Sequence, residues 1–316
     1  MNFQQLRILR ETVRQDFNLT TVANTLFTSQ PGVSKHIKDL EDELGVEIFV
    51  RRGKRLLGLT EPGREVLGVV ERILLDAQNV RHIAEHFSSR ESGHLVIAAT
   101  HTQARYALPE AIKEFRADYP KVRLFLHQGS PREIAELLTT GDADLAIASE
   151  CLTDIPEIAA FPFYTWRHAV IVRRGHPLVK IRNPTLADIA EYPIITYQEG
   201  FTGRHNIDHA FAEAELVPDV VLSAVDADVI KTYVDIGLGI GIIASMAYHP
   251  ERDDNLARID ASGLFAPNTA RLAIRRGAYL RSYAYALIEK LVPGLSEQRI
   301  GEILRNESLA DQDFSI

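Results

Sequence analysis

Residues 19–49 constrain the possible fold of this chain more than any other segment, because their pattern is typical of a DNA-reading helix-turn-helix. Apolar residues mark one face of a short helix at 19–26. A second helix should begin after Thr28 or Ser29, either of which can cap it, with Pro31 tolerated in its first turn. Its buried stripe is predicted from steps of four, three and four residues: Val33, Ile37, Leu40 and Leu44.

The opposite face of the second helix carries donors and cations of the kind that reach base edges and phosphates in a major groove. The residues expected to face the groove are Ser29, Gln30, Pro31, Ser34, Lys35 and Lys38. Taken alone, this segment also fits a surface helical hairpin, so the DNA-binding interpretation depends on the neighbouring segments of the chain.

A basic turn containing glycine comes next, between two short apolar runs, which predicts a β-hairpin. As a wing beside the recognition helix, it would contact phosphates through Arg51, Arg52, Lys54 and Arg55. A solvated surface turn is the alternative. The net charge of −8 is unevenly spread: residues 1–90 hold 13 Lys+Arg and 12 Asp+Glu, or +1, which leaves −9 for the rest. Local charge governs phosphate contact better than the total does.

A long helix is predicted from Thr60, a potential cap, to about Phe87, with Pro62 in its first turn. Its apolar positions repeat in steps of four and three, the spacing of two helices packed along a shared stripe. They are Val66, Val70, Ile73, Ala77, Val80, Ala84 and Phe87. The expected partner is the same helix of a second subunit, as a protein that reads two half-sites requires. Packing onto its own chain is the alternative.

Beyond a polar hinge near residue 92, predicted strands and helices alternate, which indicates an α/β architecture with mainly parallel sheets. We expect three parts: a winged helix-turn-helix at 1–60, a dimerising linker helix and hinge at 61–92, and a two-lobed domain at 93–316. Lobe I should span about 93–161 and 267–292, and lobe II about 162–266. A length of 316 residues allows this division.

Cellular location is indicated by what the sequence lacks. There is no apolar run of 18 residues and no signal pattern, so neither a membrane span nor export is expected. The single cysteine, Cys151, cannot form an internal disulfide. A reducing cytoplasm is therefore predicted.

A ligand site is expected where the first α/β strand ends and a helix predicted over 103–119 begins. Ligands of open α/β sheets bind beyond the carboxyl ends of strands, and a helix N-terminus there favours anions. Neutral donors suit a small anion or zwitterion. The predicted residues are Thr100, Thr102, Gln103 and Thr202, with Ser130 and Ser149 at further strand ends as weaker candidates. Simple capping by the threonines is the alternative. No catalytic motif stands out, so we expect no enzyme, metal site or cofactor.

With these residues in view, the sequence resembles a LysR-type transcriptional regulator over its whole length. Three stretches are similar to that family's helix-turn-helix: 28–35 (TSQPGVSK), 40–45 (LEDELG) and Phe49. Longer strings resemble the CysB branch, which governs sulfur assimilation and cysteine synthesis. They are 100–109 (THTQARYALP), 127–131 (HQGSP), 200–204 (GFTGR) and 226–233 (DADVIKTY).

The resemblance implies a homotetramer built from two dimers, with an effector domain like periplasmic binding proteins. It also implies a regulator that acts mainly as an activator on promoter DNA with RNA polymerase. The implied effector is O- or N-acetylserine, sulfate or a related sulfur anion. Thr100, Thr102, Gln103 and Thr202 match the family's anion-binding positions, while Ser149 stands where threonine is usual.

Three rival interpretations remain, and two of them belong to other classes of protein. A sister regulator of sulfonate use would sense adenylyl sulfate or sulfate through the same hydroxyls. A solute-binding protein is opposed by the first 90 residues, and an enzyme with a DNA-binding appendage is opposed by the lack of catalytic motifs.

Overall fold

The computed structural model describes residues 1–53, 55–88, 92–261 and 263–305, with the side chains of 85–88 and 305 left aside. Two compact units emerge: Met1–Phe87 with Gly277–Tyr279, and Ser88–Arg276 with Leu280–Ile316. We call the first the DNA-reading unit and the second the two-lobed unit. Among the described residues, no helix is long and apolar enough to cross a membrane.

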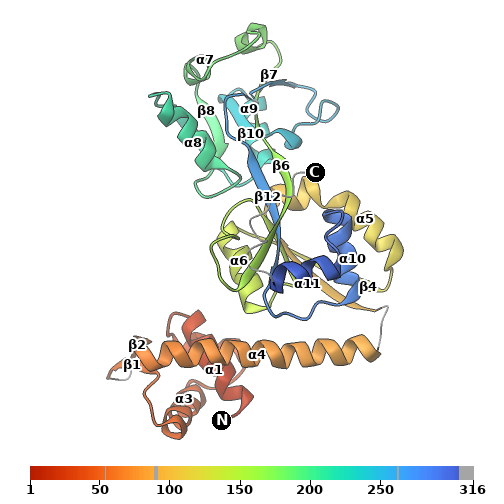
Figure 1. Ribbon diagram of the computed structural model, residues 1–316. Coiled ribbons are helices and arrows are strands. Elements are labelled where there is room, and N and C mark those ends of the chain that lie inside the picture. Colours follow the sequence, from red (N-terminus) through yellow and green to blue (C-terminus); the bar gives the residue numbers. More distant parts are fainter. Residues whose placement is uncertain (54, 89–91, 262, 306–316) are drawn as a thin grey trace. The chain divides into compact units, whose positions relative to one another are not determined.

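The DNA-reading unit is a helical core with a two-stranded hairpin and a long final helix (Figure 1). In chain order its elements are α1 Phe3–Arg14, α2 Leu19–Thr25, α3 Gln30–Leu44, β1 Phe49–Arg52, β2 Arg55–Leu59 and α4 Glu61–Ser88. The strands β1 and β2 pair antiparallel, as the predicted wing requires.

The second helix of the helix-turn-helix begins as the sequence predicts. Ser29 caps α3 by accepting a hydrogen bond from the Gly32 N–H, and proline occupies its first turn. Val33, Ile37 and Leu40 are buried, but Leu44 is 40% exposed. Leu44 was wrongly assigned to the stripe because the helix ends there, at a glycine with left-handed backbone.

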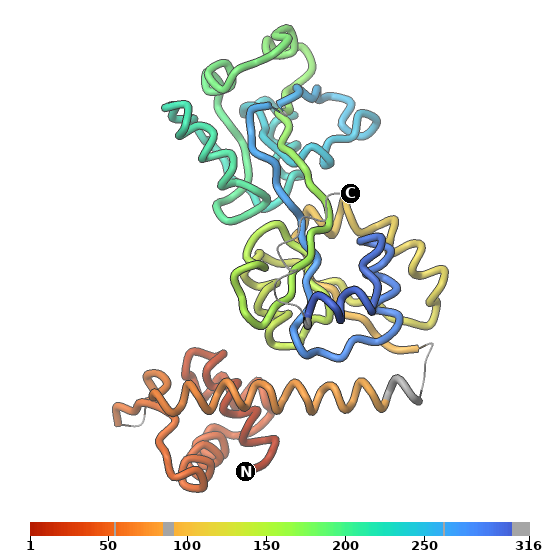
Figure 2. Tube along the Cα trace, in the orientation of Figure 1, coloured from red at the N-terminus to blue at the C-terminus, as the bar shows by residue number. Residues whose placement is uncertain are grey.

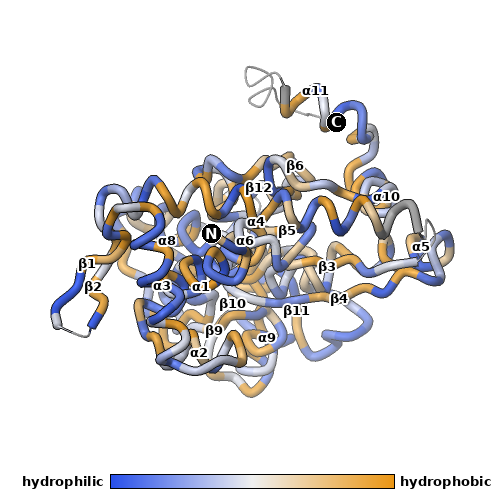
Figure 3. The backbone as a smooth tube through the Cα atoms, turned by 90° about the horizontal axis from the view of Figure 1, so that it is seen from below, coloured by the Kyte–Doolittle hydropathy of each residue, from blue (hydrophilic) through white to orange (hydrophobic). Residues whose placement is uncertain are grey.

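Helix α4 begins at the predicted cap, since the Thr60 hydroxyl accepts from the Gly63 N–H at 2.9 Å. The first part of the predicted seam, including Val66 and Val70, packs into the unit's own core. Val80 is 65% exposed. The first turns of α4 therefore pack onto their own chain, because their apolar side chains complete the core of the small winged domain. The Phe87 side chain lies outside the described ones. Hydrophobic and hydrophilic residues alternate along α4 in Figure 3.

The two-lobed unit contains two five-stranded sheets. The sheet of lobe I has the order β4-β3-β5-β12-β6, with β3 Gly93–Ala99, β4 Val122–Gln128, β5 Leu145–Ala148, β6 Ile158–Trp166 and β12 Asn268–Arg275. The sheet of lobe II has the order β11-β7-β10-β8-β9, with β7 His168–Arg173, β8 Ile194–Tyr197, β9 Val220–Ala224, β10 Ile240–Ala244 and β11 Leu256–Ile259.

Both sheets are mixed, which corrects the expectation of mainly parallel strands. In lobe I, β12 pairs antiparallel with β5 and β6, and in lobe II, β7 pairs antiparallel with β10 and β11. Strand β6 was not predicted, nor was β11. Pro162 interrupts the β6 pattern, and the ladder shifts register opposite it, where a bulge accommodates the missing N–H.

The chain passes between the lobes along β6 and back along β12, which run side by side (Figure 2). Because β6 belongs to the lobe I sheet up to Trp166, lobe I extends past residue 161, where the sequence placed its end. It also extends past residue 292, since Ile300 and Ile303 lie in its core.

Helices cover both faces of each sheet. In lobe I, α5 Pro109–Asp118, α10 Ser282–Leu291 and α11 Glu297–Arg305 share one core, and α6 Pro131–Thr140 packs in the other. In lobe II, α8 Arg204–Glu213 and α9 Ala227–Asp235 pack in different cores. Short elements complete the unit: η2 Pro177–Lys180, α7 Leu186–Ala190 and η3 Ser245–Ala247.

The helix predicted over 103–119 is instead two elements. A π-helical turn, η1 Gln103–Ala107, precedes α5, which starts at Pro109. Proline fits the first turn of a helix but not its interior, so it starts a new helix here. The π-turn places Gln103 and Ala104 inside the unit.

Candidate functional site

The recognition face of α3 is exposed to solvent. Ser29, Gln30, Pro31, Lys35 and Lys38 are exposed and Ser34 is half-buried. The Gln30 amide donates to the Ser34 hydroxyl at 3.3 Å, so these two predicted base-contacting groups lie next to each other. The surface therefore offers amide, hydroxyl and ammonium donors from one helix.

A buried carboxylate holds the wing against α3. Glu41 accepts from the backbone N–H groups of Ile48 at 2.9 Å and Phe49 at 3.2 Å, and it pairs with Arg51 at 2.5 Å. Arg51, predicted to contact phosphate, is therefore already paired within the unit. Arg52 and Arg55 are exposed, while Lys54 lies outside the described residues. The role of Glu41 depends on contacts that no local pattern signals.

The four main predicted effector residues are buried in the two-lobed unit, and two of them meet where the lobes join. Thr100, Thr102, Gln103 and Thr202 are all buried, at no more than 4% exposure. The Thr102 and Thr202 hydroxyls lie 3.4 Å apart and join lobe I to lobe II. Polar groups this deeply buried need hydrogen-bond partners, and these hydroxyls can donate to a ligand's oxygens.

Two aromatic residues of β6 orient the donors of this site. The Tyr164 hydroxyl donates to Oε1 of Gln103 at 2.6 Å, which leaves the Gln103 amide hydrogens for a ligand. The Trp166 indole donates to the Ser149 hydroxyl at 3.1 Å, so that hydroxyl keeps its own proton to donate. The sequence predicted neither aromatic as a site residue, because it placed Tyr164 in no strand and took Trp166 as the start of the following strand.

The loop of Thr202 is held in an uncommon conformation. Thr202 has φ +43°, a region that β-branched residues rarely adopt, and Gly203 comes next at φ +68°. The buried His168 ring donates to the Thr202 carbonyl at 3.1 Å. Burial lowers the pKa of His168 to about 4, so the ring is neutral near pH 7. Strain maintained by surrounding contacts is typical of functional sites.

Ser130, a weaker candidate, bonds to its own helix. Its hydroxyl accepts from the Glu133 N–H, and its own N–H donates to the Glu133 carboxylate at 2.7 Å, which is a capping box. Helix capping explains this serine, and its hydrogen bonds to Glu133 do not involve Thr100, Thr102 or Thr202.

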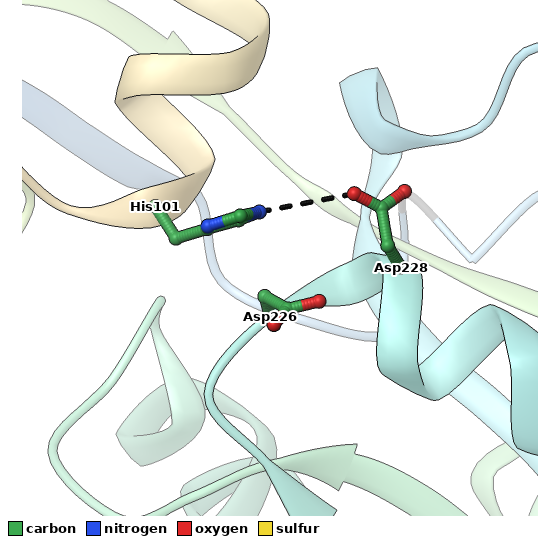
Figure 4. A group of neighbouring side chains, drawn as sticks. All are labelled: His101, Asp226 and Asp228. Atoms are coloured by element: carbon green, nitrogen blue, oxygen red, sulfur yellow. Dashed lines mark ion pairs between the residues drawn. The ribbon is translucent and has the colours of Figure 1, made fainter. Parts of the chain in front are cut away.

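A second set of contacts between the lobes centres on Asp228. It pairs with Arg105 at 2.6 Å and Lys231 at 3.1 Å, and His101 lies 3.8 Å away beside Asp226 (Figure 4). Three such ligand atoms could hold a metal ion, but two cations already neutralise Asp228. The arrangement favours an ion-pair network that links the lobes.

The geometry of the two units defines a class of protein. A winged helix-turn-helix presents a donor-rich helix, and a two-lobed α/β unit brings buried hydroxyls together between its lobes. That combination is typical of DNA-binding proteins that respond to a small molecule.

Comparison with known families agrees with this class. Residues 3–64 match the bacterial regulatory helix-turn-helix protein, lysR family, and residues 88–296 match the LysR substrate binding domain. The chain belongs to the LysR family of transcriptional regulators, which are not enzymes, as the sequence predicted.

Individual relatives lie in the CysB branch, the group of sulfur-related regulators that the sequence resembles. The chain is 60% identical to the transcriptional regulator SsuR of Burkholderia cenocepacia, covering 96% of this chain and 99% of that one. It is 54% identical to Cbl of Escherichia coli over the full length of both, and 52% identical to CysB of B. cenocepacia over 98% of each.

Solved structures show the same fold. The cofactor-binding domain of the Cbl transcriptional regulator is 50% identical, with a TM-score of 0.65, and covers 67% of this chain and 93% of that one. The regulator CbnR in complex with its target DNA is 20% identical, with a TM-score of 0.57 over 92% of this chain and 99% of that one. The latter likeness concerns the fold alone.

Proposed function

We propose that this chain is a cytoplasmic regulator, mainly an activator, of genes for sulfur assimilation and cysteine biosynthesis, controlled by a small acetylserine or sulfur-anion effector. The observation that carries the proposal is the meeting of two buried hydroxyls, Thr102 of lobe I and Thr202 of lobe II, in a chain with an exposed recognition helix. RNA polymerase is the expected partner at the promoter.

In this proposal α3 enters the major groove with Ser29, Gln30, Pro31, Ser34, Lys35 and Lys38 toward the bases. The wing lies on the backbone, with Arg52, Lys54 and Arg55 at phosphates and Arg51 supporting them through Glu41. Phosphate contacts position the protein and base contacts specify sequence, so the two sets should respond differently to substitution.

Arg52→Ala should weaken binding to all DNA sequences alike and lower the slope of log affinity against log salt by about one, because one phosphate contact is lost. Fluorescence anisotropy over a salt series measures this slope. Arg182→Ala is the matched control, since it removes an exposed arginine from lobe II. An unchanged slope for Arg52→Ala would remove Arg52 from the interface.

Dimerisation through α4 is supported by the apolar side chains that the unit leaves outside its own core. Val69, Val80 and Ile83 are 45%, 65% and 38% exposed. A helix of the partner subunit could cover them, which is the arrangement needed to read two half-sites. The tetramer implied by the family would then pair two such dimers.

The effector would bind where Thr102 meets Thr202. An anion there can accept hydrogen bonds from both hydroxyls and from the Gln103 amide. A ligand that fits one arrangement of the lobes better than another shifts the population toward it. Such a shift would change how the DNA-reading units of an oligomer are presented.

Thr102→Val, which keeps the side-chain shape and removes the donor, should weaken effector binding about 10- to 100-fold, since a hydrogen bond to a charged group contributes about 1.5–3 kcal/mol. Isothermal titration with acetylserine, sulfate and adenylyl sulfate provides the measurement. Ser130→Ala, which alters only a helix cap, should bind within about threefold of wild type. Failure of wild type to bind any of the three ligands would refute the effector site.

A sister regulator that senses adenylyl sulfate or sulfate is the second candidate. The similarity to SsuR and Cbl, at 60% and 54% identity, supports it beside CysB at 52%. The same titration separates the two candidates by which ligand binds most tightly.

A further inference from the structure

Glu150 is a carboxylate at the lobe junction that the proposed function does not use. It lies after Ser149, just beyond the end of β5, and its Oε1 accepts a hydrogen bond from the Gly203 N–H of lobe II at 2.5 Å. Its other oxygen, Oε2, is buried and has no hydrogen-bond partner among the described residues. Gly203 is the residue after Thr202, so Glu150 contacts the loop that carries an effector residue.

Within the described residues, no neighbouring charge is among the causes of the pKa shift of Glu150, which are burial and backbone hydrogen bonds. His168, behind the Thr202 loop, stays neutral near pH 7. Arg204 is engaged by Asp208 and by the Tyr197 carbonyl. The Cys151 thiol has a raised pKa, mainly from partial burial and then from the negative charge of Glu150, while Arg132 acts in the opposite direction and Asp154 adds to the rise.

Burial raises the pKa of Glu150 to about 7, although backbone hydrogen bonds from Gly203 and from Glu150 itself act in the opposite direction. The side chain is therefore near its midpoint at neutral pH. Ionised, it is an acceptor with one unsatisfied oxygen, and protonated, it becomes a donor.

We propose that Glu150 selects the effector by accepting a hydrogen bond from an N–H or O–H group of the ligand, so that the site takes a small anion that also carries a donor. The inference rests on the proposed effector site between Thr102 and Thr202. An acylated amino acid has both features, since its carboxylate can face the threonines while its amide or ammonium N–H faces Oε2.

A bare sulfate ion has no donor to offer. Placed beside an ionised and desolvated carboxylate, it would suffer charge repulsion that little water screens. Sulfate should therefore bind together with a proton on Glu150. Because that proton is lost as pH rises through the pKa of Glu150, sulfate affinity is highest below pH 7 and falls above it. An acylated amino acid should not lose affinity over the same rise.

The test is isothermal titration of the full chain with N-acetylserine and with sodium sulfate at pH 6 and pH 8. For a group with a pKa near 7, the protonated fraction falls about tenfold between these pH values, so the sulfate Kd of wild type should rise about tenfold. In Glu150→Gln, which stays neutral and can donate, sulfate binding should become independent of pH and match wild type at pH 6.

Glu157→Gln is the matched control, because it makes the same change at an exposed site of lobe I and should keep the wild-type pH dependence. Glu150→Asp, which restores an ionisable group, should recover it. A wild-type sulfate Kd that is equal at pH 6 and pH 8 would overturn the role of Glu150 without any variant being needed. Binding of neither ligand at either pH would instead refute the effector site itself, and this inference with it.

Discussion

Glu41→Ala should destabilise the DNA-reading unit by about 2–4 kcal/mol. The substitution leaves the N–H groups of Ile48 and Phe49 without their acceptor, and each buried donor left unsatisfied costs about 1–3 kcal/mol. It also releases Arg51, whose only recorded ion pair in the described part of the chain is with this carboxylate. The wing would lose its anchor on α3, and promoter affinity should fall with stability.

Differential scanning calorimetry of the full chain would show the transition of the DNA-reading unit at lower temperature, with that of the two-lobed unit unmoved. Asp42→Ala removes an exposed acid one residue further along the same helix and should leave both transitions in place. Glu41→Gln, which keeps an acceptor oxygen, should fall between the two. A Glu41→Ala protein that melts like wild type would show that the wing does not depend on this contact.

Gly203→Ala should reduce effector affinity about 100-fold. A Cβ at this position would overlap the Asn268 side-chain amide, and φ +68° strains any residue other than glycine. The loop must move to relieve the overlap, and Thr202 moves with it. Misplacing the Thr202 hydroxyl, a donor to a charged ligand that contributes about 1.5–3 kcal/mol, accounts for the magnitude.

Gly200→Ala is the control for strain without overlap. Gly200 also has positive φ, at +79°, but a Cβ there meets no atom within 4 Å. It should cost stability of about 1–2 kcal/mol and leave effector affinity within about threefold of wild type. Equal losses of affinity in both variants would show that backbone strain, and not the Asn268 contact, positions Thr202.

Local patterns were sufficient for the elements that carry the site. The cap at Ser29, the stripe through Val33 and Ile37, and the placement of Thr100–Gln103 at a strand end each depend on neighbours in the chain. The spacing of these residues reflects helix and strand periods, which hold wherever the element is placed.

Patterns failed where a residue's role depends on a distant segment. The π-turn at Gln103 and the bulged strand through Pro162 depart from regular periods, so neither left a recognisable signal. The first part of the α4 seam was assigned to the wrong partner. An apolar helix stripe does not indicate whether it packs against its own domain or against another chain.

The sequence by itself determined that the chain reads DNA, that an α/β unit comes after the DNA-reading part, and that neutral donors gather at a strand end, because these depend on periodicity and residue chemistry. Only the tertiary structure decided that Thr102 meets Thr202, that Tyr164 and Trp166 orient the donors, and that Glu150 faces the Gly203 loop. These contacts join residues from about 20 to 100 positions apart, and their geometry comes from how two sheets pack and cross over, which no local spacing encodes.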